Sequence, residues 1–303
     1  MFETEKGAMM KISMLLPVYN EEEFLTYSLA TTIDYVDEVI IVDGGPFGPS
    51  DDKTHEIISG FDKIYPNKIK YFSGTFRFDN GGWDESASRN LGLSNVTGDF
   101  LMPHCGDMIY THDGMARMVD AVNRYPDKKI IYCLFAEFWK DERYIRLYRG
   151  NAMEAWYPVM AISDMPIVSM DIIDKYIDGP HLHLNRSLVP GSQESNDAFL
   201  YVPNVYRYHY GWISGFDKQV EKHIRNMTMG AWASNPEMDI RDKGDMEIAK
   251  WAINHVIGYK GEQCYFDYCG EIPLRKRFSY LDRHDETIAK YEALYGEGFW
   301  INE

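Results

Sequence analysis

The feature of this sequence that most restricts its fold is a regular alternation of strand-length apolar runs and helical segments over the first 125 residues. The expected strands, all apolar, cover 11–18, 36–42, 69–72 and 100–102. The expected helices, which lie between these strands, cover about 20–33, 52–61 and 84–93. Strands that alternate with helices form a mostly parallel sheet with helices on both faces. The sequence therefore predicts an α/β, doubly wound fold.

The pattern becomes mixed after this region. A helix capped by Asp113 is expected to end near Tyr125. Two further strands, rich in aromatic residues, are expected at 130–138 and 144–148. Residues 156–210 are irregular and interrupted by prolines, and helical spacing returns at 216–232 and 245–257. We therefore expect two units, the sheet domain in residues 1–234 and a C-terminal helical extension packed on it in residues 235–303.

The composition is that of a globular protein with an acidic surface. The chain has 303 residues, 31 basic and 47 acidic side chains, a net charge of −16 and 15% aromatic residues. So many aromatic residues exclude a disordered chain, and the negative charge opposes general nucleic-acid binding. Its four cysteines show no metal or disulfide spacing, and its first apolar run is broken by Pro17. We therefore predict a cytoplasmic protein without an integral membrane segment.

Two acidic residues follow the ends of two predicted strands. Asp43 ends the second apolar run, and Asp107 lies in the loop after the fourth strand. Ligands of open α/β sheets bind outside the carboxyl ends of the strands, so both acids are expected at one ligand site. The alternative for Asp43 is a plain turn residue, because Gly44 and Gly45 supply turn geometry.

Four short motifs follow one another in a specific order, at Pro17-Val18-Tyr19-Asn20-Glu21, Val42-Asp43-Gly44-Gly45, Ser88-Arg89-Asn90 and Gly98-Asp99-Phe100. In sequence and order they resemble glycosyltransferase family 2, nucleotide-sugar-dependent enzymes of the GT-A fold. A later segment is similar to the branch that contains lipopolysaccharide-core glucosyltransferases, at Tyr208-His209-Tyr210-Gly211-Trp212, Lys222 and Arg225-Asn226. The resemblance covers about residues 11–230, and it implies a GT-A type sheet.

The resemblance implies a nucleotide-sugar pocket at the edge that carries the two acids. The residues implied for donor binding are Pro17, Tyr19, Glu21, Asp43, Arg89 and Asp107. Tyr19 would lie against the base, Glu21 would accept hydrogen bonds from ribose hydroxyls, and Asp43 would accept from the base edge. Arg89 would face the base carbonyl or the phosphates, or would pair with an acid of its own helix, Asp84 or Glu85.

The resemblance also implies a divalent metal, Mn²⁺ or Mg²⁺, held by an Asp-x-Asp motif after the fourth strand. The matching residues are Cys105-Gly106-Asp107, so a thiol replaces the first acid. We therefore predict Asp107 as a metal ligand, with His209 and the donor's phosphate oxygens completing the shell. His104 is a further candidate, whereas Cys105 is expected to be a small buried side chain.

Sugar transfer with inversion needs a base that deprotonates the acceptor hydroxyl as the diphosphate leaves. The resemblance places this base on a loop before residue 208, where Glu194 and Asp197 are candidates and the spacing to His209 favours Glu194. The predicted activity is an inverting, hexosyltransferase-like glycosyltransferase of glycan biosynthesis. Its partners would be a nucleotide-diphosphate sugar and a glycan, lipid-linked or protein acceptor. Because Cys105 removes one metal acid, a catalytically inactive nucleotide-sugar-binding or partner-binding relative is the alternative.

Overall fold

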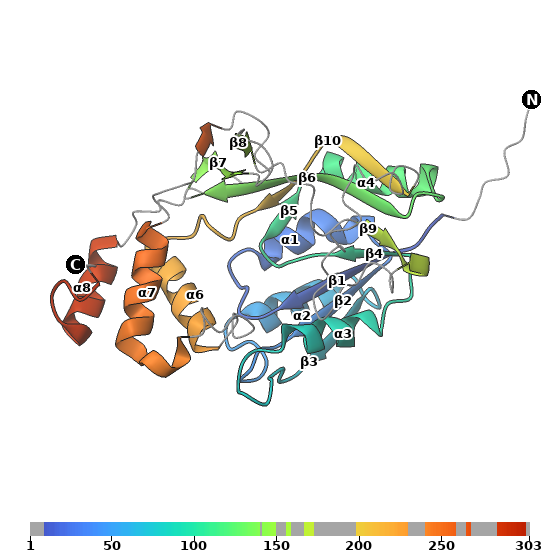
Figure 1. Cartoon of the computed structure of the whole chain (residues 1–303). Helices are drawn as coiled ribbons and strands as arrows, with labels where there is room; N and C mark the ends of the chain where they lie inside the picture. The colour runs from blue at the N-terminus through green and yellow to red at the C-terminus, as the bar shows by residue number, and fades with distance from the viewer. Residues whose placement is uncertain are drawn as a thin grey trace, which may run out of the picture.

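The molecule is built around a mixed β-sheet with helices on both faces (Figure 1). This computed structural model describes residues 9–139, 141–149, 156–158, 167–172, 198–229, 240–258, 265–267 and 284–300. The strands follow the order β11-β7-β6-β9-β4-β1-β2-β3, and β10 pairs with β5 and β6. The α/β prediction is confirmed.

The N-terminal half of the sheet is parallel, as predicted. Its strands are β1 (Ile12–Val18), β2 (Glu38–Asp43), β3 (Ile69–Ser73) and β4 (Phe100–Pro103). The helices between them are α1 (Leu25–Thr32), the 3₁₀ turn η1 (Ile33–Tyr35), α2 (Thr54–Ile64) and α3 (Glu85–Leu93). All of these strands and helices were expected within a few residues of their observed bounds, except for the start of α1.

The other half of the sheet is mixed. Its elements are β5 (Met108–Tyr110), α4 (His112–Arg124), β6 (Ile130–Trp139), β7 (Asp141–Arg149), β8 (Trp156–Pro158), β9 (Ile167–Ser169), η2 (Met170–Ile172) and β10 (Phe199–His209). The long strand β10 runs parallel to β6 and antiparallel to β5. The sequence predicted irregular structure there, because Pro203 and Asn204 interrupt the strand pattern at a shift of register between Tyr201 and Tyr206.

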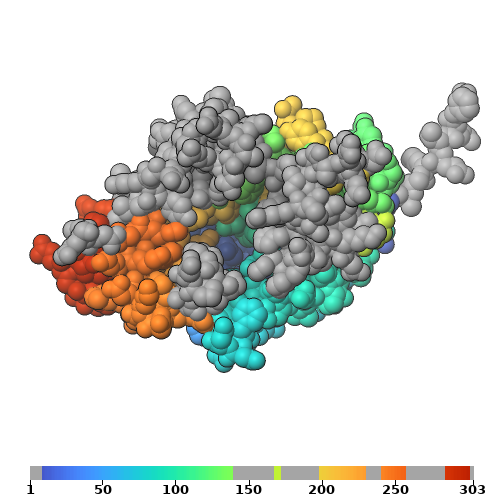
Figure 2. Space-filling model, viewed as in Figure 1, coloured from blue at the N-terminus to red at the C-terminus, as the bar shows by residue number. Residues whose placement is uncertain are grey.

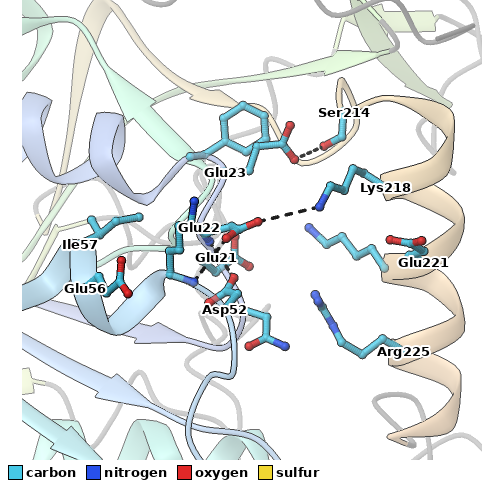
Figure 3. Close-up of a pocket in the computed structure, with 14 residues that line it drawn as sticks. Glu21, Glu22, Glu23, Asp52, Glu56, Ile57, Ser214, Lys218, Glu221 and Arg225 are labelled. Carbon is cyan, nitrogen blue, oxygen red and sulfur yellow. Dashed lines mark hydrogen bonds and ion pairs between the residues drawn. The ribbon is translucent and has the colours of Figure 1, made fainter. Parts of the chain in front are cut away.

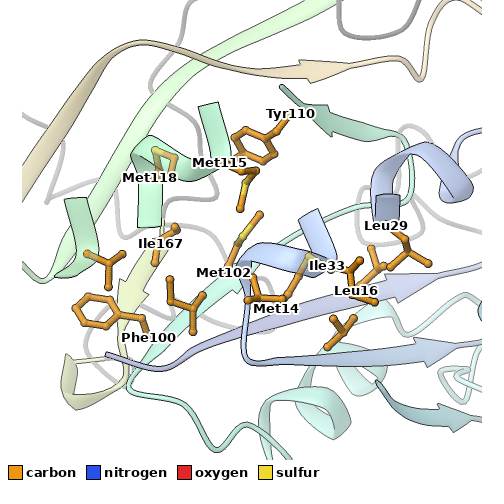
Figure 4. Close-up of a cluster of buried hydrophobic side chains, with 14 of the residues drawn as sticks. Met14, Leu16, Leu29, Ile33, Phe100, Met102, Tyr110, Met115, Met118 and Ile167 are labelled. Carbon is orange, nitrogen blue, oxygen red and sulfur yellow. The ribbon is translucent and has the colours of Figure 1, made fainter. Parts of the chain in front are cut away.

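Two hydrophobic layers fix the helices on the sheet. On one face, Met14 and Leu16 of β1 pack with residues of α1, α2 and α4 (Figure 4). On the other face, Leu15 of β1 and Val42 of β2 pack against α3. Adjacent residues of β1 face opposite layers, as in any extended strand buried on both sides. This packing sets the carboxyl ends of β1 and β2 at one edge.

Two helix starts differ from the sequence analysis. The helix expected from residue 20 begins only at Leu25, because Asn20 has a φ of +55° and its side-chain amide donates to Asp51 at 2.7 Å. The left-handed backbone at Asn20 turns the chain away from the helix, and asparagine tolerates this conformation better than most residues. The N-cap of α4 is Thr111, whose side chain accepts from the N–H of Gly114, rather than Asp113.

The last helices, α6 (Phe216–Thr228), α7 (Asp245–Gly258) and α8 (His284–Tyr295), form a separate hydrophobic cluster. The remaining short elements are η4 (Arg241–Lys243) and β11 (Tyr265–Asp267). The predicted boundary after residue 234 therefore falls between α6 and α7, which pack on each other. Division of the chain at that boundary stays a prediction.

Within the described ranges, every helix is too short or too polar to cross a bilayer.

A buried carboxylate joins three parallel strands at the edge opposite the predicted site. Glu38 of β2 accepts from the hydroxyl of Ser13 at 2.5 Å and from the N–H of Thr97 at 2.6 Å. Its other oxygen lies 2.6 Å from Nζ of Lys70 on β3. Burial alone would raise the pKa of Glu38, but the contacts with Lys70, Ser13 and Thr97 lower it to about 2.

This network gives the first prediction, on stability. Glu38→Gln is expected to lower the free energy of unfolding by roughly 2–3 kcal/mol at pH 7, since a pKa unit corresponds to about 1.4 kcal/mol. The folded-state pKa lies below the model-peptide value of 4.5. The advantage of the wild type is therefore complete above pH 4.5 and disappears as the pH falls toward 2. Urea denaturation of both proteins at pH 7 and pH 3 measures this; an equal difference at both values contradicts it.

Candidate active site

The predicted acids meet at the carboxyl edge of the parallel strands. Asp43 is the last residue of β2 and lies in register with Val18 of β1. Asp107 lies between β4 and β5, and its carbonyl accepts from the N–H of Tyr210, directly after β10. His209, the last residue of β10, pairs with Met108 of β5. Residues that are far apart in the sequence therefore converge at one edge.

Asp107 is buried between two cationic groups. Its Oδ2 lies 3.3 Å from Nε2 of His209 and 3.3 Å from Nζ of Lys222 on α6. Burial alone would raise the pKa of Asp107, but the charges of His209 and Lys222 outweigh burial and hold it well below its usual range. Among the described residues, Oδ1 of Asp107 has no hydrogen-bond partner. One carboxylate oxygen is therefore available to a ligand.

The imidazole of His209 lies between two carboxylates. Its Nδ1 is 3.1 Å from Oε1 of Glu137, a buried residue of β6, and its Nε2 faces Asp107. Burial would lower the pKa of His209, but Asp107 and Glu137 raise it to about 9. Oε1 of Glu137 also accepts from the indole N–H of Trp212 at 3.1 Å. The ring orientation is therefore set from both sides.

The residues around Asp107 fit a divalent metal with an incomplete protein shell. Oδ2 of Asp107 and Nε2 of His209 are 3.3 Å apart, close to the separation of about 3 Å expected for neighbouring ligands at about 2.1 Å from one ion. A Cβ on Gly211 would lie 2.6 Å from both atoms, so this glycine keeps the space beside them open. No group of three His, Cys, Asp or Glu side chains within the described ranges is arranged to hold a metal. Further ligands would come from water or substrate, as is usual for Mg²⁺.

Two other metal candidates near Asp107 are unsuited to this role. Burial, with the negative charge of Asp107, raises the pKa of the Cys105 thiol to about 12, so the thiol stays protonated. His104 is buried, and its Nε2 lies 2.9 Å from the hydroxyl of Ser28 in the core. Burial and the charge of Arg207 lower the pKa of His104 to about 3. The expectation that His104 contributes to the site is not supported by this position, and Cys105, which was expected to be buried, is only partly buried.

Tyr19 forms an aromatic wall at this edge, within reach of the charges of Asp43 and Arg225. Its ring lies against Gly45, where an added Cβ would come within 2.7 Å of the ring. On another side, Arg225 of α6 lies over the ring, with 5.9 Å from the guanidinium carbon to the ring centroid. Nε of Arg225 is buried without a hydrogen-bond partner, and Arg225 has no ion pair among the residues that the structure describes. A cation without an acceptor therefore faces the predicted base wall.

Asp43 and Arg89 have protein partners at this edge. Asp43 is fully buried and accepts from the N–H and hydroxyl of Ser50 and from the hydroxyl of Tyr71. Arg89 is bonded to Glu85 at 2.5 Å, so the alternative of pairing within its own helix is confirmed. The charge of Arg89 also acts on Cys105, which places it near the same loop. Contacts of either residue with a nucleotide stay predictions.

A cavity of about 660 Å³ lies between α6 and the segments that precede α1 and α2. Figure 3 shows Lys218 and Arg225 extending from α6 across this cavity, whose lining also includes Glu221. Glu21, Lys222 and Arg225 line the cavity and also act electrostatically on one another beside Asp107. Burial and the charge of Asp107, partly offset by Lys222, raise the pKa of Glu21 to about 7. In Figure 2, N-terminal residues (blue) are visible at the floor of a hollow beside the C-terminal helices (orange).

The predicted bases, Glu194 and Asp197, lie outside the described residues. Glu137 was not predicted as a site residue, although an acid between the fully buried Ala136 and Phe138 requires a partner. Lys222 and Arg225 were predicted only as parts of a motif. Their positions at the site depend on the packing of α6, which no local pattern predicts.

Comparison with known proteins gives a family match over more than half of the chain. The family model described as "Glycosyl transferase family 2" matches residues 13–177. The minor teichoic acid biosynthesis protein GgaA of Bacillus subtilis is 35% identical over 91 residues, which cover 28% of this chain and 18% of that protein. The uncharacterized glycosyltransferase YfnE of the same organism is 30% identical over 138 residues, which cover 43% of this chain and 31% of that protein. The matches thus span less than a third of either relative.

Solved structures are more distant. The structure of S. aureus TarS 1–349 in complex with UDP has a TM-score of 0.43 and 14% identity, covering 83% of this chain and 73% of that one. Glucosyl-3-phosphoglycerate synthase from Mycobacterium tuberculosis, in complex with Mn²⁺, UDP and phosphoglyceric acid, has a TM-score of 0.43 and 15% identity. That comparison covers 66% of this chain and 70% of the synthase chain.

Proposed function

Because this chain belongs to glycosyl transferase family 2, we propose that it transfers a sugar from a nucleotide-diphosphate donor to an acceptor hydroxyl, with inversion. The observation that carries the proposal is the pair of Asp107 and His209, 3.3 Å apart at the carboxyl edge of the sheet. The cations Lys222 and Arg225 lie beside this pair, and Tyr19 forms the adjoining wall. Such a site suits an anionic, aromatic ligand.

A divalent ion, Mn²⁺ or Mg²⁺, would be held by Asp107 and His209. When bound, the ion neutralises charge on the departing diphosphate. Lys222 and Arg225 add positive charge from α6, one next to Asp107 and the other next to Tyr19. A diphosphate between a base on Tyr19 and an ion on Asp107 would therefore meet both cations.

The acceptor is defined by its hydroxyl group. We propose Glu194, with Asp197 as the alternative, as the base that removes the hydroxyl proton. The name of the relative GgaA, a minor teichoic acid biosynthesis protein, supports a role in polymer or glycan biosynthesis. The motif at residues 208–226 supports a hexosyl donor, as in the lipopolysaccharide-core branch that it resembles.

The proposed function is tested by a screen for sugar release. The purified protein is incubated with UDP-, GDP-, CDP-, dTDP- and ADP-sugars, each with Mn²⁺, Mg²⁺ or EDTA, and free nucleoside diphosphate is measured. We expect slow metal-dependent release from one class of donor, which a suitable acceptor accelerates. Donor binding without any release would favour the inactive relative, and absence of both binding and release would contradict the proposal.

The cations of α6 give the second prediction. Lys222→Gln and Arg225→Gln are each expected to weaken UDP binding about 10–100-fold, because hydrogen bonds to charged groups contribute about 1.5–3 kcal/mol. Uridine has no phosphate, so its affinity should change less than about twofold. Arg124→Gln is the matched control, since Arg124 pairs with Asp120 within α4 and neither residue lines the cavity. Calorimetric titrations with UDP and uridine measure the effect, and equal losses for both ligands would contradict a role at the diphosphate.

A further inference from the structure

Glu137 is a buried acid that the proposed transfer leaves without a role. It lies in β6, in register with His209 of the parallel strand β10. Its neighbours Ala136 and Phe138 are fully buried in a hydrophobic cluster. Burying a carboxylate costs several kcal/mol unless charged or hydrogen-bonding partners compensate. Its position in the strand therefore requires partners, and one of these is His209, a residue of the candidate metal site.

Glu137 contacts the imidazole ring of His209 and fixes the orientation of that ring. Its Oε1 is 3.1 Å from Nδ1 of His209, which turns Nε2 toward Asp107. Histidines that bind metals commonly donate their other ring N–H to a carboxylate, which fixes the tautomer and increases the basicity of the ligating nitrogen. We propose that Glu137 positions His209 for metal binding, an inference that rests on the metal-assisted transfer proposed above.

Trp212 is a second partner of Glu137. Its indole N–H donates to the same Oε1 at 3.1 Å. The indole packs on His223 of α6 with ring centroids 5.2 Å apart, and His223 lies 4.7 Å from His255 of α7. His255 in turn stacks on Trp251 at 4.5 Å. A continuous set of ring contacts therefore leads from α7 to Trp212, and Glu137 and Trp212 together are positioning residues of the site.

Variants that keep the shape of each side chain test this inference. Glu137→Gln removes the charge, and Trp212→Phe removes the indole N–H while keeping an aromatic ring. The C-terminal region offers a matched pair, because Nε1 of Trp300 donates to Oε1 of Glu292 at 3.1 Å, away from the cavity. Glu292→Gln and Trp300→Phe therefore make the same chemical changes to the same type of contact elsewhere.

The measurements are the affinity for Mn²⁺ in the presence of UDP, by electron paramagnetic resonance of the free ion, and the affinity for UDP in EDTA. Glu137→Gln is expected to weaken Mn²⁺ binding about 10–100-fold, and Trp212→Phe about 3–10-fold. UDP binding in EDTA should stay within about twofold in both variants, as should Mn²⁺ binding in both controls. The double variant should lose little more than Glu137→Gln alone, because both changes act on one contact.

Two results separate this inference from the proposed function. A wild-type protein that binds UDP but neither Mn²⁺ nor Mg²⁺ would overturn metal assistance itself. A wild-type protein that binds Mn²⁺, with Glu137→Gln and Trp212→Phe binding it equally well, would overturn only the positioning role. Should Glu137→Gln fail to fold, Trp212→Phe alone decides, because it leaves the carboxylate in place.

Discussion

Replacement of Asp107 by Asn is expected to lower the turnover number for sugar transfer at least about a thousandfold. The change removes the negative charge between His209 and Lys222, and with it the predicted metal ligand. Loss of a single group that stabilises transition-state charge typically costs about 10²–10³ in turnover, and loss of the ion adds to this. The effect is measured as kcat with saturating donor and Mn²⁺.

The control for this variant is Asp99→Asn. Asp99 accepts from the N–H of Lys11 at 2.9 Å and lies before β4, at the opposite end of the strand from Asp107. It should keep a turnover number within about twofold of the wild type. Thermal unfolding of Asp107→Asn verifies that the variant is folded. A folded Asp107→Asn protein that retains Mn²⁺ affinity and turnover would remove Asp107 from the mechanism.

Gly211→Ala is expected to abolish metal binding without unfolding the protein. The new methyl group would lie 2.6 Å from Oδ2 of Asp107 and 2.6 Å from Nε2 of His209, so it occupies the space that the ion requires. We expect the affinity for Mn²⁺ to fall at least about 100-fold, since both ligand atoms must move apart to admit the methyl group. Gly211 has no positive φ, so alanine is compatible with its backbone.

Gly60→Ala provides the comparison for Gly211→Ala. Gly60 lies in α2 with nothing within 4 Å of its added Cβ, and alanine there should raise stability by about 1 kcal/mol. Titration of both variants with Mn²⁺ in the presence of UDP distinguishes them. Wild-type metal affinity in Gly211→Ala would show that the ion, if bound, does not lie between Asp107 and His209.

The sequence predicts the parallel half of the fold closely, because local signals determine it. The strand β2 and the helix α3 appear where the apolar run at 36–42 and the helical spacing at 84–93 indicate them. The strand β10 could not be predicted in this way, since its partners β5 and β6 are distant in sequence and its own pattern is broken at Pro203.

The same contrast applies to the candidate site. Asp43 and Asp107 follow strands that the sequence marks, so their location at one edge could be predicted from topology. The location of Glu137 beside His209 could not be predicted, because it depends on the register between β6 and β10. The expected place of Arg89 near this edge does not define its partner either, as its observed ion pair is with Glu85.

The placement of β10 between β5 and β6 has a consequence for the synthesis of the protein. Asp107 and Glu137 are translated long before His209, yet backbone pairing of β10 with both strands is what unites the three residues. Contacts so distant in sequence form late, after the entropy of closing a long loop has been overcome. A nascent chain on the ribosome therefore cannot bring Asp107, Glu137 and His209 together until residue 209 has left the exit tunnel.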